Sequence, residues 1–163
     1  MRFWLVALLA SMSCVSVPQS VPSAGEGSAP RSAPPAHPAT ARLVSSVSSI
    51  RPGATFRIGV LVEMLPGWHV YWKNPGDAGL PTSVRFTVPE GFEVGDLEWP
   101  TPIAFVQPGD IRGYGYEGSV LLAATVRAPR ELRTDGTIAI AAECRWLSCE
   151  RVCVPGRADL TLD

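Results

Sequence analysis

Two cysteines near the C-terminus have a spacing that suits reversible disulfide chemistry. Cys149 and Cys153 are separated by three residues. On a straight strand, residues four apart lie about 13 Å from each other, whereas bridged cysteines need Cα atoms about 4.4–6.8 Å apart. A bridge between them therefore requires the chain to turn back, as in a three-residue hairpin loop that places the two cysteines opposite each other.

Such a bridge would contribute little as a structural crosslink. Closing so short a loop removes only about 2 kcal/mol worth of conformational entropy from the unfolded chain in the chain-entropy model. A dithiol near solvent that can open and close is better suited to thiol–disulfide exchange, where one thiolate attacks a partner and the other resolves the mixed disulfide.

The remaining cysteines have different surroundings. Cys14 falls in an N-terminal segment discussed below, so three cysteines belong to the rest of the chain. An odd number in an exported protein leaves at least one thiol outside any intramolecular bridge. Cys144 shares a strand face with Ile140 and Ala142, and we expect it to lie in the core as a small hydrophobic residue.

An aromatic motif lies about 80 residues before Cys149. Trp68, Tyr71 and Trp72 are predicted to pack in the core or between two sheets. His69 alternates with Tyr71, so the two side chains share one face of a strand. A lone histidine in this position is expected to be a hydrogen-bonded surface residue rather than a base.

The segments that must position these residues follow the period of β-strands. Apolar residues alternate with polar or small ones at 56–62, 84–88, 120–126 and 138–144. Turn signals rich in Pro and Gly separate these rows, and no window of eleven residues shows a helical period. The pattern predicts an all-β fold, an immunoglobulin-like β-sandwich of about seven to nine strands.

The chain divides into three parts by composition. It has 163 residues, 46% hydrophobic and 18% charged, enough for one domain with a real core. We expect a signal peptide at 1–16, a disordered linker rich in Pro and Ala at 17–40, and the β-sandwich domain at 41–163. His37, between two prolines of the linker, is expected to be a solvated loop residue.

The N-terminus has the layout of an export signal. A positive start at Met1-Arg2 precedes an apolar stretch from Phe3 to Ala10, which is too short for a transmembrane helix. Cys14 stands where a lipoprotein carries its acylated cysteine, but the residues before it make a poor lipobox, and a lipid tether is not expected. The segment therefore predicts export from the cytoplasm.

The charge balance excludes one class of partner. Fourteen basic and fifteen acidic residues give a net charge of −1. A nucleic-acid-binding protein would normally show a basic excess, so no nucleic-acid partner is expected.

Two stretches resemble a known family. They are residues 66–82 (PGWHVYWKNPGDAGLPT) and 146–156 (WLSCERVCVPG), and 114–118 (YGYEG) also fits. Together they resemble the N-terminal (alpha) domain of the thiol:disulfide interchange protein DsbD and its relatives in the ScsB group. The resemblance implies an immunoglobulin-like sandwich in the bacterial periplasm with a redox-active pair, Cys149 and Cys153.

The resemblance also implies an activity and its partners. Such a domain takes electrons from a membrane-embedded domain and hands them to periplasmic disulfide isomerases and thioredoxin-like proteins, as a component of a protein-disulfide reductase. Full-length members continue into that membrane domain, whereas this sequence ends at Asp163, so a longer or a separate chain would supply the donor. The three-residue spacing is similar to that of the ScsB-like relatives.

The resemblance assigns roles to individual residues. Cys153 resembles the cysteine that links to the partner, and Cys149 would resolve the mixed disulfide. Tyr71, with His69 beside it, would lie near the disulfide and slow its adventitious reduction. A capping loop corresponds to about residues 106–112.

Two alternatives stay open. Sco-type copper chaperones also contain Cys-x-x-x-Cys, and thiolates select Cu(I). Cys144, Cys149, Cys153 and His69 could then be ligands, but the Sco motif precedes a helix and no helical pattern follows Cys153. The other alternative is a purely structural or binding sandwich. On balance we expect thiol–disulfide exchange with no metal or other cofactor.

Overall fold

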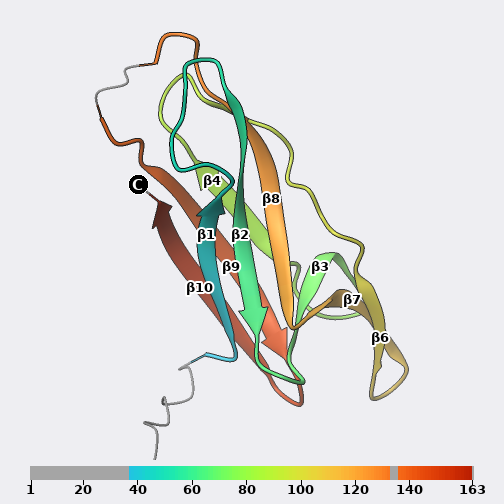
Figure 1. The fold of residues 1–163 in the computed structure, drawn as a ribbon. Helices are drawn as coiled ribbons and strands as arrows, with labels where there is room; N and C mark the ends of the chain where they lie inside the picture. Colours follow the sequence, from blue (N-terminus) through green and yellow to red (C-terminus); the bar gives the residue numbers. More distant parts are fainter. Residues whose placement is uncertain (1–36, 133–135, 163) are drawn as a thin grey trace, which may run out of the picture. The chain divides into compact units, whose positions relative to one another are not determined.

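The computed structural model describes residues 37–132 and 136–162, and these form ten strands connected by turns (Figure 1). The first five are β1 (Ala39–Ser45), β2 (Thr55–Met64), β3 (His69–Gly76), β4 (Ser83–Thr87) and the two-residue β5 (Glu93–Val94). The others are β6 (Ile103–Gln107), β7 (Ile111–Glu117), β8 (Ser119–Arg127), β9 (Ile140–Cys149) and β10 (Cys153–Leu162).

The strands form two antiparallel sheets. One has the order β1-β2-β8-β5, and the other has the order β10-β9-β3-β7-β6, with β4 paired to the first half of β9. The all-β, immunoglobulin-like sandwich predicted from the alternating pattern is confirmed. Within the described ranges there is also no helix long and apolar enough to cross a membrane.

The core lies between the two sheets, where alternate residues of facing strands meet. From the four-stranded sheet, Val60, Val62 and Leu122 are fully buried in it. From the six-stranded sheet, Val70 of β3 and Cys144 of β9 are equally buried. These positions fall on the period-2 apolar rows, because successive side chains of a strand point to opposite faces.

The β9–β10 hairpin is the longest pairing of the six-stranded sheet. Its register runs from Cys153 opposite Cys149 at the turn to Leu162 opposite Ile140 at the other end. β10 is an edge strand, whereas β9 lies inside the sheet between β10 on one side and β3 and β4 on the other. The two cysteines therefore lie at one end of the sandwich, where the hairpin turns.

The start of the fold differs slightly from the predicted boundary at residue 41. β1 begins at Ala39, so the first strand includes two residues that composition assigned to the linker. The signal peptide expected at 1–16 and the linker up to residue 36 lie outside the described residues.

Candidate active site

A disulfide joins Cys149 at the end of β9 to Cys153 at the start of β10. Their Cα atoms are 4.2 Å apart, and the backbone N–H of Glu150 donates to the carbonyl of Val152 across the turn, at 3.2 Å. The chain thus turns back between the cysteines, as the spacing argument required. Cys144 is free and buried.

The two half-cystines differ in their access to solvent. Only 1% of Cys149 is exposed, whereas Cys153 is exposed and the neighbouring Val152 is 63% exposed. The difference follows from the sheet order, because Cys149 lies on an inner strand and Cys153 on an edge strand. A partner sulfur can therefore reach Cys153 more easily than Cys149.

β3 places His69 directly across from Cys149. The two are register partners in the antiparallel β3–β9 pair, and His69 is also the partner of Glu117 on β7. Opposite residues of such a pair have Cβ atoms about 4.5–5.5 Å apart and project to the same face of the sheet. His69 is only 7% exposed, so the expectation of a surface histidine is wrong, because β3 lies between two neighbouring strands.

The β6–β7 hairpin covers this part of the sheet. The ring of Phe105, from β6, lies 4.2 Å from the His69 ring centroid and 5.9 Å from that of Tyr71. Gln107 donates its side-chain N–H to the Tyr71 hydroxyl at 3.1 Å. The stretch 106–112 expected to form a capping loop belongs to this hairpin, whose contacts with His69 and Tyr71 come from Phe105 and Gln107, while Val106 is 68% exposed.

Tyr71 lies beside His69 on the same face of β3. Its ring meets the His69 ring edge-on, with centroids 5.2 Å apart, and only 1% of the residue is exposed. Trp68 and Trp72, in contrast, have the other parity and pack against the core between the sheets. The aromatic motif thus contributes side chains to both faces of the sheet, and Tyr71 lies on the face that carries Cys149.

Burial affects the titration of His69. Desolvation lowers the pKa of its imidazole below the usual 6.5, although the negative charge of Glu117 acts in the opposite direction. The Nε2 atom is buried and has no hydrogen-bond partner among the described residues. The ring is therefore neutral at pH 7, with one polar atom unsatisfied inside the site.

The segment after β3 supports the site in a way that the sequence reasoning missed. Asn74-Pro75-Gly76-Asp77 was interpreted only as a turn, but residues 74–76 end β3, and Asp77 forms two bonds with Arg112 near the turn of the β6–β7 hairpin. Its N–H donates to the Arg112 carbonyl and its carboxylate accepts from the Arg112 N–H, both at 2.9 Å. The sequence did offer one signal. Asp77 follows Pro75-Gly76 and precedes Gly79 and Pro81, and Asp, Gly and Pro all favour turns.

Glycine is required at two positions of close approach. A Cβ on Gly79, whose φ is +99°, would overlap the ring of Tyr71. A Cβ on Gly113 of β7 would overlap the ring of Phe105. The two aromatic side chains near His69 therefore lie flat against backbone that has no side chain of its own.

Cys144 is separated from this site by the sheet itself. It is five residues from Cys149 on β9, so the two side chains project to opposite faces. Burial raises the pKa of the Cys144 thiol to about 12. The four residues considered as copper ligands are not brought together, and no cluster of three metal-ligating side chains occurs in the parts of the chain that the structure describes.

His37 also differs from expectation. Its Nε2 lies 3.0 Å from the carbonyl oxygen of Pro155, its Nδ1 lies 2.9 Å from that of Ala39, and its ring meets Trp146 edge-on at 5.6 Å. His37 is therefore a loop residue, as predicted, but it is half-buried rather than fully solvated, because it lies two positions before β1 and packs on the β9–β10 hairpin.

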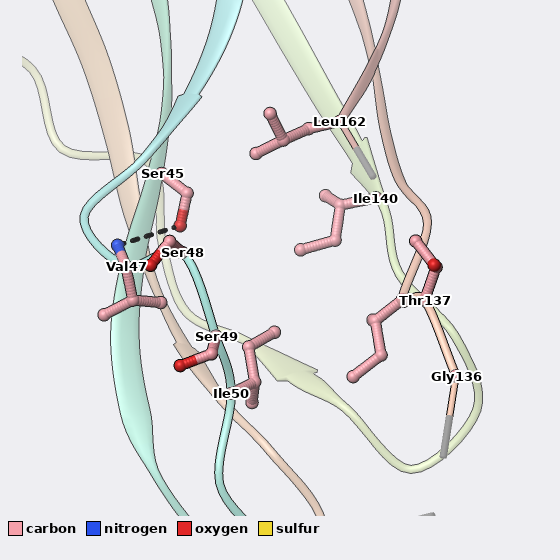
Figure 2. Close-up of a pocket in the computed structure, with 10 residues that line it drawn as sticks. Ser45, Val47, Ser48, Ser49, Ile50, Gly136, Thr137, Ile140 and Leu162 are labelled. Carbon is pink, nitrogen blue, oxygen red and sulfur yellow. Dashed lines mark hydrogen bonds between the residues drawn. The ribbon is translucent and has the colours of Figure 1, made fainter. Parts of the chain in front are cut away.

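A cleft of about 630 Å³ lies at the other end of this hairpin (Figure 2). It is lined by the residues after β1, by 136–138, and by Ile140 and Leu162. β10 has ten residues at about 3.4 Å each, which places the cleft about 30 Å from the disulfide. None of the ten lining residues has a titratable side chain, so the cleft has no chemistry comparable to that of the cysteine pair.

Comparisons with known proteins agree with this geometry. The family model of the thiol:disulfide interchange protein DsbD, N-terminal, matches residues 38–163. The crystal structure of the N-terminal periplasmic domain of ScsB from Proteus mirabilis is similar, with 25% identity and a TM-score of 0.57 over 77% of this chain. The chain spans less than half of that domain, 46% of its length.

A second solved structure is more distant. The Neisseria meningitidis DsbD N-terminal domain in the reduced form has 11% identity and a TM-score of 0.44, covering 76% of this chain and 83% of that one. A search of curated proteins finds no match.

Proposed function

Because the chain belongs to the family of DsbD N-terminal domains, we propose that it relays electrons in the periplasm through Cys149 and Cys153. The observation that carries this proposal is the bridge across the β9–β10 turn, with one sulfur exposed on an edge strand and the other buried. This is the asymmetry that an interchange thiol and a resolving thiol need.

The reaction runs in two steps from the reduced domain. The Cys153 thiolate attacks a disulfide of the partner, which forms a mixed disulfide and releases one partner sulfur as a thiolate. Cys149 then attacks the Cys153 sulfur, which closes the Cys149–Cys153 bridge and releases the second partner sulfur. The domain is oxidised by two electrons and the partner disulfide is reduced to a dithiol.

Local structure supports Cys153 as the interchange thiol. β10 has no partner strand on its outer side, and at Pro155 the carbonyl faces His37 and there is no N–H to offer a strand. An approaching active-site loop can therefore reach the sulfur without displacing a neighbouring strand. Cys149 has no such access, since β3 and β10 flank it.

The partners follow from the chemistry of the family. Electrons would come from a membrane-embedded donor domain and pass to thioredoxin-like or disulfide isomerase proteins, which makes the chain a component of a protein-disulfide reductase. Export by a signal peptide at residues 1–16 would place the domain at 41–163 in the periplasm, beyond the linker. The P. mirabilis neighbour is itself a periplasmic domain.

His69, Tyr71 and the β6–β7 hairpin would protect the pair between reactions. His69 faces Cys149 across the strands, and Phe105 and Tyr71 pack on His69. This arrangement shields the buried sulfur of Cys149 and leaves the exposed Cys153 as the sulfur that a partner attacks.

A trapping experiment tests the two roles. The probe is a thioredoxin with its second cysteine replaced by serine and its first carried as a mixed disulfide with nitrothiobenzoate. A thiolate that attacks this sulfur releases nitrothiobenzoate and links the two proteins. We expect the reduced Cys149→Ser variant to accumulate the linked species through Cys153, and the Cys153→Ser variant to accumulate little.

The matched control is Cys144→Ser, which keeps both site cysteines and should react as the wild type does. The reverse pattern, with linkage mainly through Cys149, would overturn the assignment of roles. No linkage in any variant would overturn the exchange function itself.

A further inference from the structure

His69 is a buried titratable group that the two exchange steps leave without a task. It is one of two histidines in the chain, it faces Cys149 in register, and its Nε2 has no hydrogen-bond partner among the described residues. An unsatisfied buried nitrogen costs about 1–3 kcal/mol, so a structural role alone does not account for an imidazole here.

We propose that His69 accepts the proton of the Cys149 thiol when Cys149 resolves the mixed disulfide on Cys153, an inference that rests on the function proposed above. In this step the S–H bond of Cys149 breaks and its proton passes to the imidazole. The sulfur's electron pair forms the bond to the Cys153 sulfur, and the partner sulfur leaves with the electrons of the broken S–S bond. The imidazolium then returns its proton to solvent or to the departing thiolate.

The need for a base follows from the burial of Cys149. Only the thiolate attacks a disulfide, and a low-dielectric environment disfavours the charged form of a thiol. Cys149 is 1% exposed, so water is poorly placed to take its proton. A neutral imidazole on the neighbouring strand removes this obstacle, because the proton moves over a short distance inside the site.

The groups around His69 favour the neutral ring as the resting form. Glu117 faces it from β7, Cys149 from β9, and Tyr71 from its own strand, while β6 contributes the apolar ring of Phe105. Burial outweighs the charge of Glu117 and lowers the pKa of His69. Once protonated, the ring lies between the Glu117 carboxylate and the new thiolate, and both stabilise the cation.

Tyr71 is a second titratable side chain of β3 on this face, but its geometry is different. Its hydroxyl accepts a hydrogen bond from Gln107, away from β9. Glu150, in the hairpin turn, has its carboxylate paired with Arg151. His69 is therefore the group with an unoccupied polar atom next to the resolving thiol.

The test separates the two exchange steps with DTNB, a small aromatic disulfide. The reduced full chain releases a first nitrothiobenzoate when Cys153 is modified and a second when Cys149 closes the bridge. All variants carry Cys14→Ser so that this cysteine does not react, and Cys149→Ser identifies the second phase by its loss. Stopped-flow absorbance between pH 5 and 9 gives both rates.

In His69→Gln we expect the second release to slow on the order of 100-fold near pH 7, the lower end of what a positioned base contributes. The first release should stay within about twofold of the wild-type rate. In wild type the second rate should level off above the His69 pKa, whereas in the variant it should keep rising with pH as the thiol ionises to solvent. His37→Gln, the same change at the other histidine, should leave the second release unchanged.

Each result decides a different point. A second release in His69→Gln that stays within twofold of wild type at pH 7 would overturn the inference and leave the exchange function intact. No second release in wild type would overturn the exchange function. If His69→Gln does not fold, the midpoint of the wild-type pH–rate profile is compared with the His69 ring titration measured by NMR, and a mismatch above half a pH unit overturns the inference.

Discussion

Cys144 and Cys149 lie on the same strand but on opposite faces of the sheet, one in the core and one beside the β10 edge. Five residues of a straight strand also span about 17 Å, whereas bridged cysteines need Cα atoms about 4.4–6.8 Å apart, so a bridge between them would require β9 to break. The sandwich itself therefore decides which thiols can pair.

The first prediction concerns this pairing. Peptide mapping of the purified oxidised protein should recover Cys149 joined to Cys153 and Cys144 as a free thiol. Cys144→Ala should lower the free energy of unfolding by about 1 kcal/mol, since a fully buried side chain is truncated. Urea unfolding measures the loss, and the exchange rate should not change. Cys144 bridged in most molecules, or exchange lost in a folded variant, would contradict this.

The second prediction concerns protection by the β6–β7 hairpin. Gln107→Ala removes the hydrogen bond to Tyr71, which should loosen the packing of the hairpin on Tyr71 and His69, beside Cys149. Such a hydrogen bond contributes about 0.5–1.5 kcal/mol. Its loss lowers the free energy of opening the hairpin by that amount, so reduction by dithiothreitol should become about 2- to 10-fold faster. Val106→Ala is the matched control on the same strand, because its side chain is 68% exposed. Equal rates for both variants would show that the hairpin does not control access.

The third prediction is a pH dependence of stability. Unfolded His69 titrates near 6.5, whereas burial lowers its pKa in the fold. Between these two values the unfolded chain binds a proton that the folded chain does not, so the free energy of unfolding falls as the pH drops below about 6.5. His69→Gln should show a smaller fall between pH 7 and 5, measured by urea unfolding of the oxidised protein.

His37→Gln provides the comparison, since it keeps His69 and should keep the wild-type slope. A wild-type stability that rises relative to His69→Gln on acidification would mean that Glu117, rather than burial, dominates the pKa of His69.

The sequence was sufficient for the fold class, the strand rows and the free, buried Cys144. These properties depend on local periodicity, and periodicity is visible along the chain. The burial of Cys149 and His69 was not predictable in the same way. It depends on β3 pairing with β7 and β9, whose partner residues are about 45 and 80 positions away along the chain, and on the β6–β7 hairpin packing on His69.

Individual side chains show the same limit. His37 has no sequence signal of its own, because its partners Trp146 and Pro155 are brought to it only when β1 packs near the β9–β10 hairpin. Asp77 had a signal, a turn residue within a conspicuous motif, but its partner Arg112 could not be identified before the pairing of β3 with β7 was known. The roles assigned to Cys149, Cys153, His69 and Tyr71 stay predictions.

The last prediction concerns Asp77, which joins the segment after β3 to the β6–β7 hairpin near its turn. Its carboxylate accepts the Arg112 N–H at 2.9 Å, so Asp77→Ala leaves that donor without a side-chain partner while the Asp77 N–H bond to the Arg112 carbonyl survives. Because the residue is exposed, the cost should be about 1 kcal/mol rather than the larger penalty of a buried orphan. The hairpin carries Phe105 and Gln107, so the same substitution should speed reduction of the disulfide about fivefold, the kinetic equivalent of that energy.

Asn at this position keeps an acceptor oxygen and should restore most of the protection. Asp159→Ala, which removes an equally exposed carboxylate paired with Arg157 on β10, should leave the reduction rate unchanged. A faster reduction in Asp159→Ala than in Asp77→Ala would show that the charge of the β9–β10 surface, rather than the anchoring of the hairpin, governs access to the sulfurs.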